Sequence, residues 1–69
     1  MTQATPHVAQ AIKLPEVIKR TALSRSSVWR RVKDGAFPKP FHLGHGRAVA
    51  WLSSDIDTWL KAQAAIRYE

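Results

Sequence analysis

The sequence lacks cysteine, long apolar runs and any surplus of acidic residues, and each shortage excludes a class of protein. Without cysteine the chain can form no disulfide bond and offers no thiolate to a metal ion. No apolar run approaches the ~20 residues that a membrane-spanning helix needs. Residues 1–11 carry no apolar segment of the kind that marks a secretory signal. These absences predict a soluble, cytoplasmic protein.

What is present is positive charge on a very small chain. The 69 residues suffice for one domain, and 11 Lys and Arg against 5 Asp and Glu give a net charge of +6. A basic balance of this size favours a polyanionic partner, of which nucleic acid is the commonest. Charge alone leaves a second interpretation open, in which it only keeps the protein dispersed.

The chain divides into an N-terminal arm and one folded domain. Residues 1–12 are small and polar with little periodicity, which predicts a flexible arm, and residues 13–69 form the domain. A first short helix begins at Pro15, where the missing N–H costs no hydrogen bond, and ends near Thr21. Ala22 and Leu23 then form a tight connection.

The second helix has clear start and stop signals. Ser24 is a suitable N-cap and Gly35 stands where a left-handed residue ends a helix, so the helix spans about residues 25–34. On a projection at ~100° per residue, Val28 and Val32 lie close together and define its buried side. The opposite side presents three polar residues, Ser26, Arg30 and Lys33.

A β-hairpin and a third helix complete the predicted order. Residues 41–43 and 47–51 alternate as short strands do, and Gly44–Gly46 forms a glycine-bounded turn between them. Ser53 or Ser54 is predicted to cap the last helix. Its core-facing positions are Ile56, Trp59 and Leu60.

This order of elements predicts a mainly α-helical winged helix-turn-helix with a small β-hairpin. In a helix-turn-helix the second helix enters the DNA major groove, which is about 12 Å wide and admits one helix. The hairpin would be the wing, with His45 and Arg47 at a tip that reaches an adjacent backbone or minor groove. The predicted partner is double-stranded DNA.

Simpler interpretations of the second helix stay open. Its cations could be solvated charges on a short amphipathic helix without any partner. Trp29 could pack over the junction between helix and hairpin, because large aromatic side chains are mostly buried. In the functional interpretation, the Trp29 ring lies along the sugar-phosphate backbone with its N–H on a phosphate.

These motifs resemble those of a known family. The run V-x-x-x-T-A-L-S-R-S-S-V-W-R-x-V-K-D-G-x-F-P-K-P covers residues 17–40, and L-G-x-G-R-A-V-A-W and S-D-I-D-x-W-L follow it. Together they are similar to the AlpA family of small phage- and prophage-encoded DNA-binding proteins. That family is related to excisionases and to the winged-helix domain of MerR-type regulators. The resemblance extends over residues 14–60.

The resemblance implies roles for individual residues. The helix after Leu23 would be the recognition helix and the loop around residues 44–47 the wing. DNA-contact roles would fall on Ser24, Arg25, Ser26, Ser27, Trp29, Arg30 and Lys33, and on Arg47 in the wing. Scaffold roles would fall on Pro38, Trp51, Ile56 and Trp59.

Two positions depart from the family pattern. Family members usually have glycine where this chain has Ala22, so the turn must be made without easy access to positive φ. Members usually have tyrosine where this chain has Trp29. The indole is larger and only a donor, which changes the geometry of a backbone contact.

Other kinds of site are disfavoured. His42 and His45 have a spacing found in metal sites, but zinc prefers three or four protein ligands and no cysteine supports them. Serines are present without an accompanying base and orienting group, and no glycine-rich phosphate loop occurs. The sequence therefore predicts a protein that is not an enzyme and that holds no metal or cofactor.

Within the family, two biological roles share this domain. One is an excisionase, or recombination directionality factor, which binds tandem sites, bends DNA and assists integrase. The other is a plain transcriptional regulator of an integrase gene. We expect the first, acting as a monomer in solution that assembles cooperatively on DNA in the bacterial nucleoid. A rival from another class is a protein-binding module that docks on an acidic partner.

Overall fold

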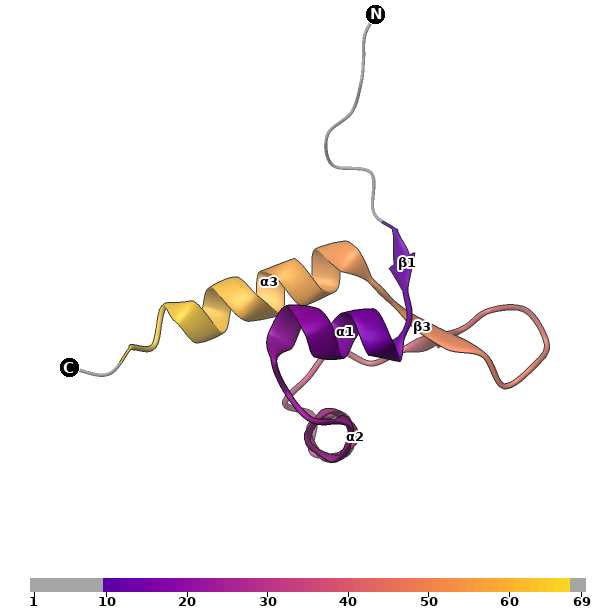
Figure 1. The fold of residues 1–69 in the computed structure, drawn as a ribbon, viewed down its shortest axis with the longest axis horizontal. Coiled ribbons are helices and arrows are strands. Elements are labelled where there is room, and N and C mark those ends of the chain that lie inside the picture. Colours follow the sequence, from indigo (N-terminus) through magenta and orange to yellow (C-terminus); the bar gives the residue numbers. More distant parts are fainter. Residues whose placement is uncertain (1–9, 68–69) are drawn as a thin grey trace, which may run out of the picture.

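Three helices and three short strands make up the part of the chain that the computed structural model describes, residues 10–67. In chain order they are β1 (Ala11–Ile12), α1 (Leu14–Thr21), α2 (Arg25–Lys33), β2 (Phe41–His42), β3 (Val49–Leu52) and α3 (Ser53–Ala64). Figure 1 shows α1 beneath α3, α2 end-on at the lower side, and the β2–β3 loop at the right. The arrangement is the predicted winged helix-turn-helix.

The turn between α1 and α2 is held by one hydroxyl and one left-handed residue. The Thr21 hydroxyl donates to the Val17 carbonyl over 2.8 Å and accepts from the Leu23 N–H over 3.3 Å. Ala22 takes a φ of 63°, in the left-handed region that glycine adopts far more easily. The turn therefore uses positive φ even though the chain has alanine there.

Helix α2 is capped at both ends, as its sequence predicts. The Ser24 side chain accepts a hydrogen bond from the Ser27 N–H over 3.1 Å. At the other end the Ala36 N–H donates to the Arg31 carbonyl over 2.8 Å, and Gly35 has a φ of 77°. This pairing beyond a left-handed glycine is a Schellman motif, which ends the helix sharply.

The sheet has the order β1-β3-β2, and both pairs are antiparallel. The predicted hairpin is present, with Phe41 paired to Ala50, and Ile12 also pairs with Trp51. Residues 11–12, which the sequence placed in the arm, therefore belong to the sheet. The remaining part of the predicted arm, residues 1–9, lies outside the described residues.

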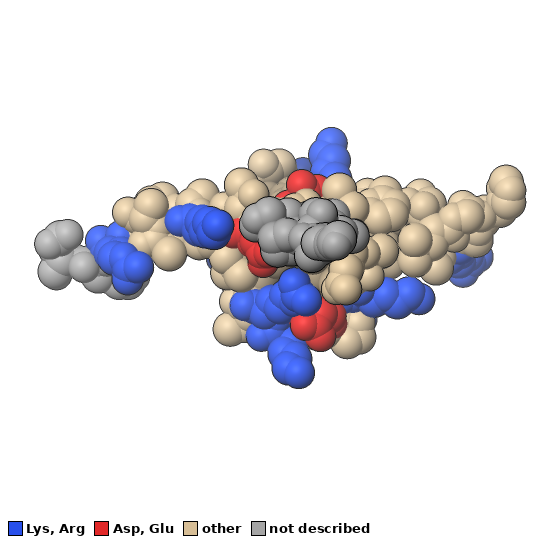
Figure 2. Space-filling model, turned by 90° about the horizontal axis from the view of Figure 1, so that it is seen from above, with Lys and Arg blue, Asp and Glu red and all other residues tan. Residues whose placement is uncertain are grey.

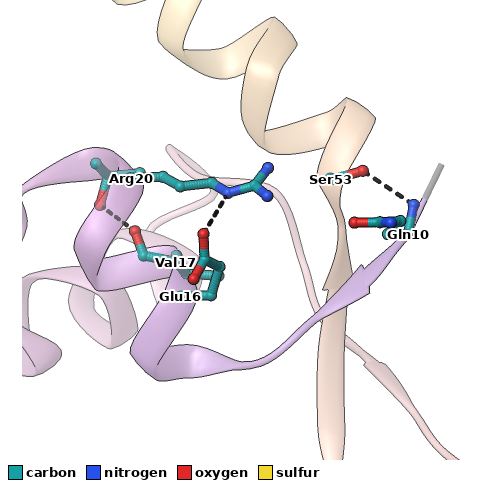
Figure 3. Close-up of polar contacts among 6 residues, drawn as sticks. Gln10, Glu16, Val17, Arg20 and Ser53 are labelled. Carbon is teal, nitrogen blue, oxygen red and sulfur yellow. Dashed lines mark hydrogen bonds and ion pairs between the residues drawn. The ribbon is translucent and has the colours of Figure 1, made fainter. Parts of the chain in front are cut away.

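The predicted serine cap of α3 is wrong. The N-cap residue is Leu52, and no side chain caps this helix end. The Ser53 hydroxyl instead accepts from the Gln10 N–H over 2.9 Å, while the Ser53 N–H donates to the Gln10 carbonyl over 2.7 Å (Figure 3). Ser53 thus extends the β1–β3 pairing, a use that depends on a neighbour 43 residues away in the chain.

The core gathers one buried side chain or more from almost every element. Its members are Ile12, Leu14, Val17, Val28, Phe37, Trp51 and Ile56. Trp59 packs edge-on against Phe37 with ring centroids 4.8 Å apart. Helix α2 contributes only Val28 to the fully buried set, so most of its surface faces outward.

Candidate nucleic-acid interface

Helix α2 rests on the domain by one narrow side. Val28 is completely buried and Val32 is half-buried against the core, as the helical projection predicts. The opposite side presents exposed Ser26, Arg30 and Lys33. A short helix held by a single apolar edge can project the rest of its surface into a groove.

The charge on α2 is of one sign. Arg25, Arg30, Arg31 and Lys33 are all exposed, and the helix contains no acidic residue. Within residues 10–67 the ion pair that the structure contains joins Arg20 to Glu16, both on α1 (Figure 3). The four cations of α2 are therefore available to an external anion.

The Glu16 carboxylate on α1 has a cationic partner, Arg20, that lowers its pKa. It accepts a hydrogen bond from Arg20 Nε over 2.9 Å. That bond, with smaller contributions from the nearby charges of Arg20 and Lys19, holds the pKa of Glu16 below its usual range. Arg20 of α1 is thus compensated locally, whereas within residues 10–67 no cation of α2 forms an ion pair.

The serines at the start of α2 divide into two kinds. The Ser24 hydroxyl accepts from the Ser27 N–H and also donates to the Ser27 hydroxyl over 3.0 Å, so both are engaged in forming the helix end. Ser26 is exposed on the outer side. Among the serines that the sequence nominated, Ser26 is the one that is exposed and does not take part in the Ser24–Ser27 bonds at the helix start.

Trp29 packs at the junction between helix and hairpin, which is one of the two interpretations that the sequence left open. Its ring packs against the buried Trp51 ring, with centroids 5.5 Å apart and planes tilted by 49°. It nevertheless remains 40% exposed. The side chain therefore joins α2 to strand β3 and still presents part of its indole outward.

The wing loop, defined here as residues 43–48, carries His45 and Arg47. Both side chains are exposed, and Gly44 makes the turn with a φ of 75°. The Leu43 N–H donates to the Ala48 carbonyl over 2.9 Å, which extends the hairpin beyond β2. Figure 1 shows the loop projecting away from the helices.

Positive charge also occurs away from α2 and the wing. Figure 2 views the domain from above, the side away from α2, and shows Lys and Arg side chains projecting at several places with acidic side chains among them. Net charge alone therefore does not locate an interface. The informative feature is the absence of acidic residues from α2.

One exposed cation of α2 was missing from the sequence-based site. Arg31 lies on the flank opposite Trp29 and is exposed. The helical projection puts it on the flank opposite Trp29, away from the buried Val28 and Val32, and that position was the available signal. Its addition gives α2 a cation on each flank as well as along its outer side.

Residues 10–67 contain no group of three or more His, Cys, Asp or Glu side chains that could hold a metal ion. None of the helices in this range has both the length and the apolar character needed to cross a bilayer. A shallow cleft lies between α3 and the α2–β2 connector, which is residues 34–40, and its lining includes Phe37, Pro38, Lys39, Asp55 and Trp59.

The fold and the exposed basic helix define the class of protein: a winged helix-turn-helix domain whose second helix is cationic and largely exposed. The family model of the prophage CP4-57 regulatory protein (AlpA) matches residues 10–64, which include every described element. The chain belongs to the AlpA family.

One relative and one negative result complete the comparison. A protein of Enterobacteria phage P4, described as uncharacterized protein ORF88, is 38% identical over 56 residues. The match covers 81% of this chain but only 62% of that relative, so the chain spans less than two thirds of the relative's length. No solved structure matches the chain significantly.

Proposed function

We propose that this protein binds double-stranded DNA in a sequence-specific way, with α2 in the major groove. The observation that carries the proposal is the outer side of α2, where exposed Ser26, Arg30 and Lys33 stand opposite the single buried anchor Val28. Arginine reads guanine through two hydrogen bonds, and lysine or serine reaches bases or phosphates. Membership of a family of phage regulatory proteins supports the same role.

The wing and the helix flanks would position the domain. Arg47 and His45 of the wing loop reach the neighbouring backbone or minor groove, while Arg25 and Arg31 contact phosphates beside α2. Trp29 lies between these two contact regions because it packs on Trp51 of the wing strand. Phosphate contacts fix the register of the helix, and the outer side of α2 supplies the base contacts.

Salt dependence tests DNA binding directly. If about five cations contact phosphates, log Kd against log salt concentration should change with a slope of magnitude near 5 for a fixed duplex. The slope is measured by fluorescence anisotropy on a labelled duplex over a range of NaCl concentrations. A slope near zero, or no duplex binding at low salt, contradicts the proposal and favours the protein-binding module.

The finer proposal is an excisionase that binds tandem sites, bends DNA and assists an integrase. A single module of this size buries only ~600–1,000 Å² on DNA, so useful specificity calls for several copies on adjacent sites. A nuclease footprint over the DNA around the gene, any attachment site and any integrase promoter decides this. Protection of two or more directly repeated sites beside an attachment core supports it, whereas one protected promoter site indicates a plain transcriptional regulator.

The proposal assigns no catalytic role, metal or cofactor to the chain. The family is one of regulatory proteins. The cleft beside α3 has Asp55 and Thr58 in its lining but no histidine or lysine–serine pair that would activate a nucleophile. Binding, with association to the nucleoid through DNA, accounts for the exposed groups without any chemical step.

A further inference from the structure

The exposed large apolar side chains of this domain are few and unevenly placed. In residues 10–67 they are Trp29, Phe41, Leu43, Leu52 and Ile66. Trp29 belongs to the interface described above. Phe41 and Leu52 lie on strands β2 and β3, Leu43 directly follows β2, and Ile66 lies just beyond α3.

Phe41, Leu43 and Leu52 share one face of the sheet. Phe41 pairs with Ala50, and Leu52 is two residues further along the same strand, so their side chains point to the same side. Trp51 and its partner Ile12 point to the other side and are buried in the core. Leu43 continues the Phe41 face, because its N–H bonds to Ala48. We call these three residues the outer sheet patch.

Ile66 forms a second apolar surface at the far end of the molecule. It is 79% exposed, directly after the last turn of α3, and its N–H donates to the Gln63 carbonyl. Exposed Ala62 and Ala65 precede it. Figure 1 shows this C-terminal end of α3 and the β2–β3 loop at opposite ends of the long axis, with α2 between them.

We propose that the outer sheet patch of one copy receives the Ile66 end of a second copy bound to the adjacent, directly repeated site. This inference rests on the proposed DNA-binding function. With α2 in the major groove and the wing on adjacent backbone, the DNA axis runs roughly along the line from α2 to the wing. Copies in the same orientation then meet end to end, which is a heterologous contact between two different surfaces.

Area and charge both explain why this contact would form on DNA. Three side chains, each about two-fifths exposed, supply far less than the ~800 Å² per partner of a stable complex. Lys13 and Lys39 lie next to strands β1 and β2, Arg47 lies in the wing loop, and residues 10–14 and 39–52 contain no acidic residue. Lys61 and Arg67 flank the Ile66 end. Copies therefore repel one another in solution. Phosphates neutralise that charge, and adjacent sites raise the effective concentration of one copy near the next.

The first test compares a duplex containing one site with a duplex containing two direct repeats. Ile66→Ser should leave affinity for the single site unchanged and lower the cooperativity factor on the double site roughly tenfold. Leu52→Ser should do the same from the other surface. Because both substitutions remove the same contact, the double variant should lose no more cooperativity than the larger single effect. Thr58→Ser, on α3 outside both surfaces, is the matched control.

Cross-linking gives a second readout that does not depend on affinity. The chain has no cysteine, so Leu52→Cys and Ile66→Cys variants each carry one unique thiol. Mixed on the two-site duplex with a short bismaleimide, they should link as 52–66 pairs, and this product should be absent without DNA. Pairs of 52 with 52, or linkage in free solution, would overturn the head-to-tail arrangement.

The outcomes separate the two proposals. If the unaltered protein fails to bind the single site, the proposed DNA-binding function fails. If single-site binding is normal but Ile66→Ser and Leu52→Ser leave cooperativity intact, the function stands and the contact between copies is wrong. In that case the outer sheet patch belongs to a different partner, such as a protein that accompanies this one on DNA.

Discussion

The α2–β2 connector, residues 34–40, and the wing loop are both short segments that contain glycine, yet they are held in opposite ways. In the connector, Trp59 Nε1 donates to the Ala36 carbonyl over 2.9 Å and Trp51 Nε1 donates to the Pro38 carbonyl over 2.8 Å. Phe37 between these carbonyls is buried. Every residue of the wing loop is exposed, and the backbone bond from Leu43 to Ala48 closes it.

This difference assigns the two segments to different properties: the connector contributes to the stability of the fold, and the wing loop is available for binding. Two indole N–H groups and one buried ring fix the path of the connector, and therefore the position of α2 relative to the sheet. The wing loop carries few internal contacts, so its side chains remain available to a partner. Substitutions in the two segments should accordingly affect different measurements.

The largest expected effect on stability is that of Trp51→Ala in the structure that holds the connector. Trp51 is fully buried and anchors the connector, so its truncation should cost about 3–5 kcal/mol of unfolding free energy. A domain of this length holds only about 3–10 kcal/mol in total at ~0.05–0.15 kcal/mol per residue. Thermal and urea unfolding measure the loss. Arg47→Ala in the wing loop is the control and should change stability by less than about 0.5 kcal/mol.

The next effect concerns binding alone. Arg30→Ala should weaken binding to the specific duplex by about 1–3 kcal/mol and relax selectivity at one base position, with an unchanged melting temperature. Arg47→Ala should weaken specific and non-specific duplexes alike and lower the salt slope by about 1. Affinity is measured on matched and single-mismatch duplexes. Normal binding by Arg30→Ala would mean that α2 does not occupy the groove.

How far the sequence predicts this fold depends on how local each signal is. Helix α2 was predicted because its cap at Ser24 and its stop at Gly35 act within one helical turn. Strand β1 was missed because two residues form a strand only through pairing with β3. The Ser53 cap was wrong for the same reason, since its hydroxyl serves Gln10 from a distant part of the chain.

The candidate site shows the same division. The outer side of α2 followed from a helical projection, because Val28 and Val32 define the buried side locally. The packing of Trp29 on Trp51 did not follow from the projection, because it depends on where Trp51 lies after folding. Of the two bonds between Ser24 and Ser27, only the N-cap bond was predicted, because capping follows from the local sequence. The bond between the two hydroxyls depends on side-chain geometry and was not predicted.

A smaller effect tests the turn that positions α2 relative to α1. Ala22 takes a φ of 63°, which costs an alanine about 1–2 kcal/mol, while glycine loses roughly 0.5–1 kcal/mol more conformational freedom on folding. Ala22→Gly should therefore stabilise the domain by about 0.5–1 kcal/mol and raise the melting temperature by several degrees. Ala22→Val, which is β-branched, should destabilise it. An unchanged melting temperature in both variants would show that the turn is not strained.

The smallest expected effect sharpens the contrast between compensated charge on α1 and uncompensated charge on α2. Arg20 lowers the pKa of Glu16 below its usual 4.5 in the folded protein, so the ionised pair stabilises the fold above that value. The contribution is lost as pH falls through the lowered pKa, because protonation then removes the partner of Arg20. The pair is solvent-exposed, so the melting temperature of Glu16→Gln should differ only slightly from that of the unaltered protein near neutral pH, and the two should converge in acid. Melting curves between about pH 3 and pH 7 measure this, and a difference that grows toward acid would show that the pair does not stabilise the native state.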